Sequence, residues 1–222
     1  MPSRLERARQ DPNSMKARIL ASARKIFGEY GYNDTTTRMI AGDVGIDIST
    51  LYYHWGEKQD LYEAVLMEIS EEIQKKLIEV EKKVSGQSLA VRLEMAIDMM
   101  SDYLFSHPEV SNLILFGYFN KTRHGVTLDI SMSKYISNIA IAMGLAKDRE
   151  KVSTEAKARI LAVWNTVLNF ISGEIFFRPL LDVNREDYIR VVKETLKFIL
   201  VPAFTAETIN DNERKEYDGA KP

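Results

Sequence analysis

Apolar residues recur at steps of three and four positions along most of this 222-residue chain, as they do between Ile19 and Tyr30. That period places apolar side chains on one face of a helix. A half-buried strand needs strict alternation of apolar and polar residues instead, and no segment of the sequence shows it. The core must therefore be built between helices, and the sequence predicts an all-α protein.

Capping residues, glycines and prolines divide this periodicity into separate helices. Asn13 or Ser14 can accept the free N–H groups at the start of the first helix, and Gly31 is placed to end it. Gly45 separates the next two helices, and Asp47 is placed to cap the second of them. The helices after the first are expected at about 36–43, 48–54, 57–84, 88–106, 108–121, 126–144, 153–177 and 185–203.

Charge is distributed unevenly along the chain. The formal net charge of −2 gives no overall attraction to nucleic acid or to an anionic membrane, so any basic surface must be local. Residues 1–25 hold seven basic residues against two acidic ones. The N-terminal end is therefore the positive end of the chain.

The chain contains no cysteine, which excludes a disulfide framework, a thiolate metal site and a cysteine nucleophile. Its start lacks the apolar stretch of a signal peptide, and no run of about 18 apolar residues occurs. We expect a cytoplasmic protein with no membrane partner.

Residues suited to catalysis are not arranged as a site. The histidines are His54, His107 and His124. None has a carboxylate or a second histidine at the spacing of a helical metal motif or a triad. Glu68, Glu71 and Glu72 suggest a carboxylate metal site, but a solvated helix face explains them better. The sequence predicts no enzyme, no metal and no cofactor.

Two short helices joined by a glycine turn, inside a basic N-terminal region, are the pattern of a helix-turn-helix unit. The second short helix would contact the bases. Its hydroxyl and imidazole groups can donate to phosphate oxygens, and Lys58 stands at a helix start that already favours phosphate. Leu51 and Trp55 are expected to face inward.

The segment "TTTRMIAGDVGIDISTLYYHWGEKQDL" resembles the DNA-binding domain of the tetracycline-repressor-like (TetR) family, and the resemblance covers about residues 14–65. Phosphate contacts are implied by the resemblance for Thr36, Thr50, Tyr53, His54 and Lys58. Base contacts are implied for Thr37, Arg38, Ile48, Ser49 and Tyr52. Apolar contact of Ile48 with a thymine methyl, and a bidentate bond from Arg38 to guanine, are two such contacts.

The resemblance also implies how the chain is divided. We expect a basic N-terminal arm over 1–13, a three-helix helix-turn-helix domain over 14–60, and a helical domain for ligand binding and dimerisation over 61–204. The long helix from about 57 to 84 would join the two domains. The polar, aperiodic segment 205–222 is predicted to be a mobile tail.

Helices 153–177 and 185–203 carry more apolar positions than one buried stripe requires. We predict that they pair with their copies in a twofold dimer, which a palindromic double-stranded DNA operator also needs. The interface residues expected are Val167, Ile171, Ile175, Val192, Leu196 and Ile199.

A ligand pocket is a further expectation, since methionine-rich and aromatic linings suit adaptable apolar cavities. The candidate residues are Met95, Met99, Tyr103, Phe116, Trp164, Asn165 and Leu168. Ordinary core packing explains any one of them better. Asn165 and Asn169 share one helix face, and the partner of each amide can be a ligand, a second subunit or a neighbouring backbone group.

These observations favour a dimeric transcriptional regulator, a repressor released from DNA by a small, largely apolar inducer. One alternative is an architectural or protein-controlled DNA-binding protein that has no inducer. Another is a helical enzyme or carrier in which the helix-turn-helix is incidental, although no catalytic candidate supports it.

Overall fold

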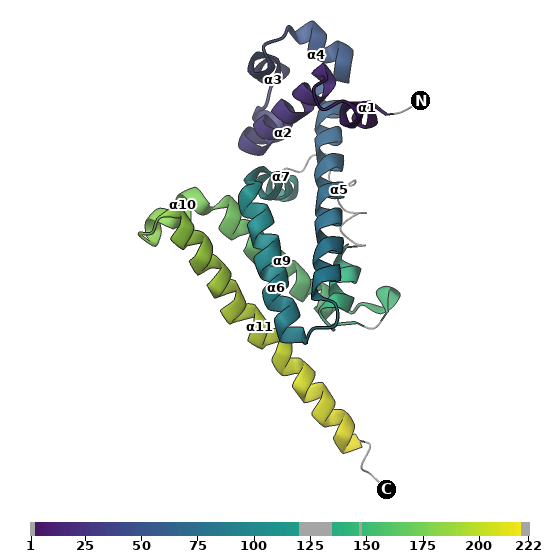
Figure 1. Ribbon diagram of the computed structural model, residues 1–222, viewed down its shortest axis with the longest axis vertical. Helices are drawn as coiled ribbons and strands as arrows, with labels where there is room; N and C mark the ends of the chain where they lie inside the picture. Colours follow the sequence, from purple (N-terminus) through teal and green to yellow (C-terminus); the bar gives the residue numbers. More distant parts are fainter. Residues whose placement is uncertain (1–2, 120–134, 147, 219–222) are drawn as a thin grey trace. The chain divides into compact units, whose positions relative to one another are not determined.

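Every regular element in the described residues, 3–119, 135–146 and 148–218, is a helix, as the computed structural model shows (Figure 1). This confirms the all-α prediction. The elements are α1 (Arg4–Gln10), α2 (Met15–Asp34), α3 (Thr37–Val44), α4 (Ile48–Trp55), α5 (Lys58–Val84), α6 (Leu89–Ser106), α7 (Pro108–Phe119), the 3-10 turn η1 (Arg149–Lys151), α9 (Thr154–Ser172), α10 (Glu174–Leu180) and α11 (Arg185–Asp218).

The helices form two compact units. The first comprises Met1–Gln74 and His107–Ser131, and the second comprises Lys75–Ser106 and Met132–Pro222. The sequence placed the domain boundary near residue 60 and assigned the helix from 108 to the C-terminal domain. The structure instead groups α7 with the N-terminal helices, because α7 packs closely against α2.

In the first unit, α2 is the central helix, contacted by α1, α3, α4 and α7. Its apolar face carries the periodicity from which the helix was predicted. Fully buried side chains of this unit include Ile19, Phe27, Ile40, Leu51 and Leu61. Gly31 has a left-handed φ of 74° and interrupts the helical path of α2 near its end, which is where the sequence placed a stop.

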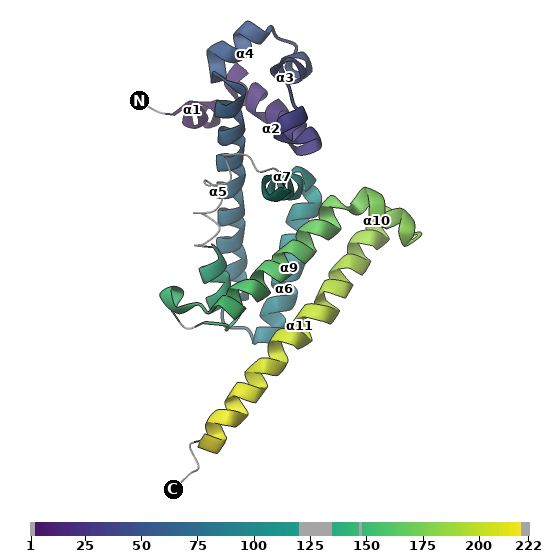
Figure 2. The ribbon, with the colours of Figure 1, turned by 180° about the vertical axis from the view of Figure 1, so that it is seen from behind.

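In the second unit, α6 and α11 lie side by side (Figure 2). Lys193 and Lys197 of α11 bind Asp98 of α6 at 3.4 and 2.6 Å. The Tyr188 hydroxyl donates to the Phe170 carbonyl oxygen of α9 at 2.7 Å, which ties α11 to a third helix. Leu168 and Leu196 are among the buried apolar side chains of this unit.

The helix expected over 153–177 is two helices, α9 and α10, bent by 79° at Gly173. A Cβ atom at Gly173 would lie 2.3 Å from the Phe177 ring and 2.8 Å from the Asn169 carbonyl oxygen. Only glycine fits between them, and this close approach lets the chain turn there. Apolar residues continue across the break without interruption, so the sequence alone does not reveal it.

The two ends of the chain also differ from expectation. Residues 4–10 of the expected N-terminal arm form α1, with Leu5 and Ala8 buried. Most of the expected polar tail is helical, since α11 continues to Asp218. The helix expected at 126–144 lies partly outside the described residues, of which 135–142 are helical.

Candidate nucleic-acid interface

The helix-turn-helix consists of α3, a glycine turn and α4. Thr36 is the N-cap of α3, and its side chain accepts a hydrogen bond from the Met39 N–H at 3.2 Å. Gly45 ends α3 with φ 75° and ψ 42°, and a Cβ there would meet nothing within 4 Å. Glycine is therefore favoured at this turn by its left-handed backbone and not by lack of space. Asp47 stands at the N-cap of α4 but makes no side-chain capping bond.

One face of α4 is anchored in the first unit. Leu51 is fully buried and Trp55 is 1% exposed, as the sequence predicted for both. The Trp55 indole N–H donates to the Lys16 carbonyl oxygen of α2 at 3.0 Å. These contacts fix the rotation of α4 about its own axis and leave its other face in solvent.

The other face carries the predicted DNA contacts. Tyr53 is 83% exposed and Tyr52 is 41% exposed. Also exposed are Thr36, Arg38 and Ser49, whereas Thr37, Ile48, Thr50 and His54 are half-buried. The structure thus places hydroxyl, guanidinium and imidazole donors on the solvent side of α3 and α4.

His54 lies at the end of α4 with its ring 5.2 Å from the Tyr53 ring, edge to face. Partial burial, and secondarily the charge of Lys16, lower the pKa of the His54 imidazole. The neutral form is therefore favoured in the free protein.

Helix α3 is fixed to α2 by polar contacts that the sequence did not reveal. The Asp43 carboxylate accepts from the Lys25 ammonium at 2.9 Å and from the Ser22 hydroxyl at 2.7 Å. These bonds, the one from Lys25 foremost, lower the pKa of Asp43. Arg18 of α2 donates to the Val44 carbonyl oxygen at 3.1 Å. In the sequence, Arg18 and Lys25 contribute only to a count of basic residues.

Lys58 has internal partners, although it was predicted to contact phosphate. Its ammonium donates to the carbonyl oxygens of Tyr32 and Thr35 at 2.8 and 2.9 Å, and lies 4.3 Å from the centre of the Tyr32 ring. The lysine therefore joins the start of α5 to the end of α2. Spacing along the sequence cannot show these carbonyl partners, because they depend on how the end of α2 meets the start of α5.

A half-buried ionic cluster joins three helices of the first unit. Arg24 of α2 has a side chain only 15% exposed and binds Glu72 of α5 at 2.7 Å and Glu109 of α7 at 3.0 Å. Glu68 lies 3.6 Å from the same guanidinium, and burial raises the pKa of its carboxyl group. Glu68 and Glu72 were predicted to lie on a solvated helix face; the Glu68 side chain is only 20% exposed, and that of Glu72 is 35% exposed and paired with Arg24. Among the described residues, no group of three or more acidic or histidine side chains is arranged to hold a metal ion.

The residues predicted to line a pocket are divided between the units. Phe116 belongs to the first unit, where a Cβ at Gly31 would lie 3.5 Å from its ring. The others lie in the second unit, where Leu168 is fully buried. Asn165 donates to the Leu161 carbonyl oxygen and Asn169 to that of Asn165, both at 2.8 Å. The sequence left three kinds of partner open for these amides. Each amide in fact binds a backbone carbonyl group of its own helix.

The residues predicted at the dimer interface differ sharply in exposure. The four that are buried within the chain itself are Val167, Ile171, Val192 and Leu196. They have no surface to offer to a partner, because they form the core between α9 and α11. Ile175 is 85% exposed and Ile199 is 52% exposed. The excess of apolar positions in these helices thus covers both an internal core and an exposed face.

No single helix of the described segments has the length and apolar composition to cross a membrane. The bent pair α9 and α10 satisfies those two criteria only when the helices are taken together.

Comparison with known proteins gives a match to the N-terminal helices. Residues 19–65 match the family described as "Bacterial regulatory proteins, tetR family", and this segment contains all the predicted DNA contacts. The HTH-type transcriptional dual regulator CecR of Shigella flexneri is 47% identical over 47 residues, which are 21% of each chain. The HTH-type transcriptional repressor AcnR of Corynebacterium glutamicum is 27% identical over 106 residues, 42% of this chain and 55% of AcnR. The chain thus spans from about a fifth to about half the length of these two curated relatives.

Solved structures resemble the chain over more of its length. A transcriptional regulator from Rhodococcus sp. RHA1 has a TM-score of 0.60 at 15% identity, covering 86% of this chain and 97% of that one. The transcriptional regulator FadR of Bacillus subtilis, solved with stearoyl-CoA, has a TM-score of 0.60 at 12% identity, covering 83% and 96%. At such identities the likeness shows a shared fold.

Proposed function

We propose that this chain, whose residues 19–65 match the tetR family of bacterial regulatory proteins, is a DNA-binding repressor of that family. It binds a palindromic operator as a dimer in the cytoplasm and leaves the DNA when a small, largely apolar molecule binds. Family and fold point to a regulator and not to an enzyme.

The observation that carries the proposal is the two-sided character of α4. Leu51 and Trp55 hold one face rigidly, while Tyr53 on the opposite face is 83% exposed. The Tyr53 hydroxyl is therefore accessible to solvent on a rigidly held helix, and it can donate to a phosphate oxygen. Arg38, exposed on α3, can make a bidentate bond to guanine in the same groove.

A second copy of the chain is the proposed occupant of an apolar face on α10 and α11. The exposed residues of this face are Ile175, Phe176, Leu180, Phe198 and Ile199. The two helices contact each other, and an exposed apolar surface of this kind is typical of an interface. A palindrome presents two equal half-sites, so a twofold dimer is the partner that matches its symmetry.

The inducer is proposed to bind in the second unit. Within its described residues, Ser101 Oγ of α6, and Trp164 Nε1 and Ser172 Oγ of α9, are buried without a hydrogen-bond partner. Buried polar atoms normally have partners, and a bound ligand with polar atoms would supply them. Long-chain acyl-CoA is a suitable first probe for a ligand with an apolar chain and polar atoms, because FadR, which shares the fold, was solved with stearoyl-CoA.

The proposal is tested by capturing genomic DNA fragments with the purified protein and sequencing them. We expect enrichment of fragments that share a palindrome, and no such enrichment with Tyr53→Ala or Arg38→Ala. Adding acyl-CoA to the captured operator should release the protein if this class of ligand is the inducer. Captured fragments that share no palindrome would contradict a DNA-binding role of α3 and α4. Enrichment by the two variants equal to that by the wild type would contradict it as well.

A further inference from the structure

We propose that Arg4 of α1 is a positioning residue for DNA recognition: it locks the turn between α4 and α5 and so sets the angle at which α4 is presented to DNA. The inference rests on the proposed function and adds a residue outside the segment 19–65 that matches the family. Arg4, Asp60 and the turn between α4 and α5 all belong to the first unit.

Arg4 joins the end of α4 to the start of α5. Its Nη1 atom donates to the carbonyl oxygen of Trp55, the last residue of α4, at 2.5 Å. The same atom donates to Asp60 Oδ2 of α5 at 3.1 Å. The last carbonyl groups of a helix have no partner within the helix and carry partial negative charge, so a cation is stabilising there.

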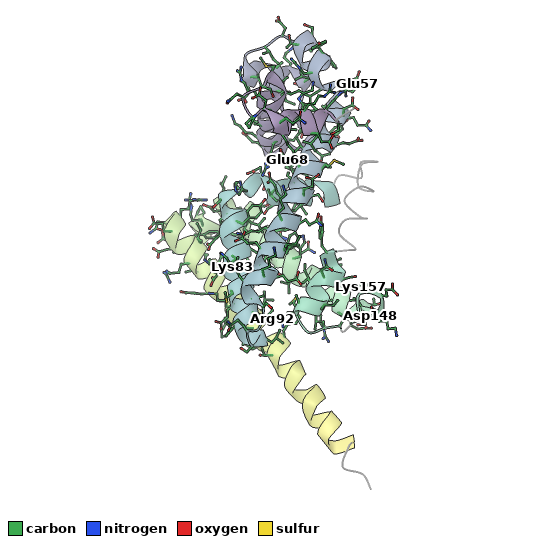
Figure 3. The ribbon with its side chains drawn as sticks, turned by 45° about the vertical axis from the view of Figure 1, so that its right-hand side comes forward. Glu57, Glu68, Lys83, Arg92, Asp148 and Lys157 are labelled. Carbon is green, nitrogen blue, oxygen red and sulfur yellow. The ribbon has the colours of Figure 1, made fainter. Side chains whose placement is uncertain are left out.

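Asp60 completes the connection. Its Oδ2 atom also accepts from the backbone N–H of Glu57, the residue before α5, at 3.1 Å. Glu57 is labelled in Figure 3 at the beginning of this helix. One carboxylate oxygen therefore satisfies a free N–H at the start of α5 while it binds the guanidinium that satisfies the end of α4.

Gly56 lies between these groups, and its geometry shows how closely they surround the turn. Its φ is +83°, and a Cβ would lie 2.3 Å from Asp60 Oδ2 and 2.7 Å from Arg4 Nη1. The left-handed backbone disfavours a side chain here, and a Cβ would displace the ends of the Asp60 and Arg4 side chains. We call Arg4, Gly56 and Asp60, with the Trp55 carbonyl, the turn clamp.

Helix α1 is itself held in place, so Arg4 is not on a loose arm. Ser3 and Glu6 form a reciprocal capping box at its start. Leu5 and Ala8 are buried, and Arg9 binds Glu71 of α5 at 2.7 Å. Ordering α1 therefore orders the clamp, and the clamp fixes the end of the helix that carries Tyr53.

A direct contact of Arg4 with phosphate is the competing explanation. It predicts the opposite change in operator affinity for one variant. Asp60→Asn keeps an oxygen that can accept from Glu57 but removes the ion pair with Arg4. If the clamp positions α4, this variant weakens operator binding. If Arg4 acts through its charge on DNA, removal of the neighbouring negative charge strengthens binding.

The experiment measures affinity for the captured operator and for random DNA over a range of salt concentrations, with Arg4→Ala, Asp60→Asn, the double variant and Arg7→Ala. We expect Arg4→Ala and Asp60→Asn each to lose roughly threefold to tenfold in operator affinity, and the double variant to lose no more than either. Affinity for random DNA and the salt slope should stay as in the wild type. Arg7→Ala, which removes an exposed charge from the same helix, should match the wild type.

Hydrogen exchange of the free protein tests the clamp without DNA. Amides at Gly56 and Glu57 should exchange faster in Arg4→Ala and Asp60→Asn but not in Arg7→Ala, and Arg4→Lys should recover part of the protection. Stronger operator binding by Asp60→Asn, a salt slope reduced by about 1 in Arg4→Ala, or unchanged exchange would overturn the inference. A wild-type protein that binds no operator would instead refute the proposed function, and the positioning role with it.

Discussion

At the residue scale, His54 gives the DNA-contact hypothesis a pH dependence. Partial burial and then Lys16 lower the pKa of its imidazole in the free protein. A phosphate beside the ring would favour the protonated form and raise that pKa in the complex. Binding then takes up a proton at pH values between the two pKa values.

We therefore predict that operator affinity increases as the pH falls through the higher pKa of the complex, and levels off below the lower pKa of the free protein. His54→Gln should not show this increase in operator affinity. Any pH dependence that comes from other groups should be the same in His54→Gln and in the wild type. The measurement is operator affinity against pH at constant ionic strength. Identical pH profiles for the two proteins would show that His54 does not contact phosphate.

The individual residues also show how far the sequence can lead. Leu51 and Trp55 were predicted to face inward because their spacing matches the helical period, and both are buried. The partners of Lys58 and Asp43 could not be predicted, because they are set by how separate helices pack. Periodicity determines which way a side chain faces, whereas hydrogen-bond partners depend on tertiary contacts.

At the element scale, the closest approach of α2 and α7 depends on Gly28. A Cβ there would lie 2.5 Å from Glu109 Cβ and 3.0 Å from Glu109 Cα. The Asn112 amide donates to the Gly28 carbonyl oxygen at 3.0 Å in the same contact. The two helix backbones are thus close enough that only glycine fits.

We predict that Gly28→Ala lowers the free energy of unfolding by about 1–3 kcal/mol, since α7 must move or strain to admit the methyl group. Gly42→Ala is the matched control, because a Cβ at this position in α3 meets nothing within 4 Å. It should raise the free energy of unfolding by roughly 0.5–1 kcal/mol through helix propensity. Urea denaturation of both variants checks the two signs, and equal stabilities would contradict the close packing.

Element boundaries were predictable where a capping residue or a left-handed glycine marks them. Gly31 and Gly45 both stand where the sequence placed a helix end. The break at Gly173 was missed because apolar residues continue on both sides of it. This glycine has a φ of −85°, so it does not act as a left-handed helix end. The helical continuation of α11 to Asp218 was missed for another reason, since a polar helix has no apolar stripe to reveal it.

At the scale of the whole molecule, the proposed dimerisation through α10 and α11 is the assembly that a palindromic operator would require. Phe198 is 80% exposed on α11 and offers the most sensitive position. We predict that Phe198→Glu yields a monomer that loses operator binding, because a buried, unpaired charge opposes association. Ile78→Glu on α5, at a residue 44% exposed, introduces the same charge away from this face and should remain a dimer.

Sedimentation equilibrium of both variants at micromolar concentration distinguishes them. A dimeric Phe198→Glu with unchanged operator affinity would place the interface elsewhere. The sequence prediction named four residues that are buried within the chain itself, since apolar composition alone does not separate a core face from an exposed face.

The most direct test of the central claim is a hydroxyl-radical footprint of the protein on its captured operator. If two copies of α4 contact the half-sites of a palindrome, two protected patches should appear on one face of the DNA, about 34–36 Å apart or a multiple of that spacing. Tyr53→Ala should lose both patches together. A single patch, or protection that persists unchanged in Tyr53→Ala, would contradict recognition by a dimer through α4.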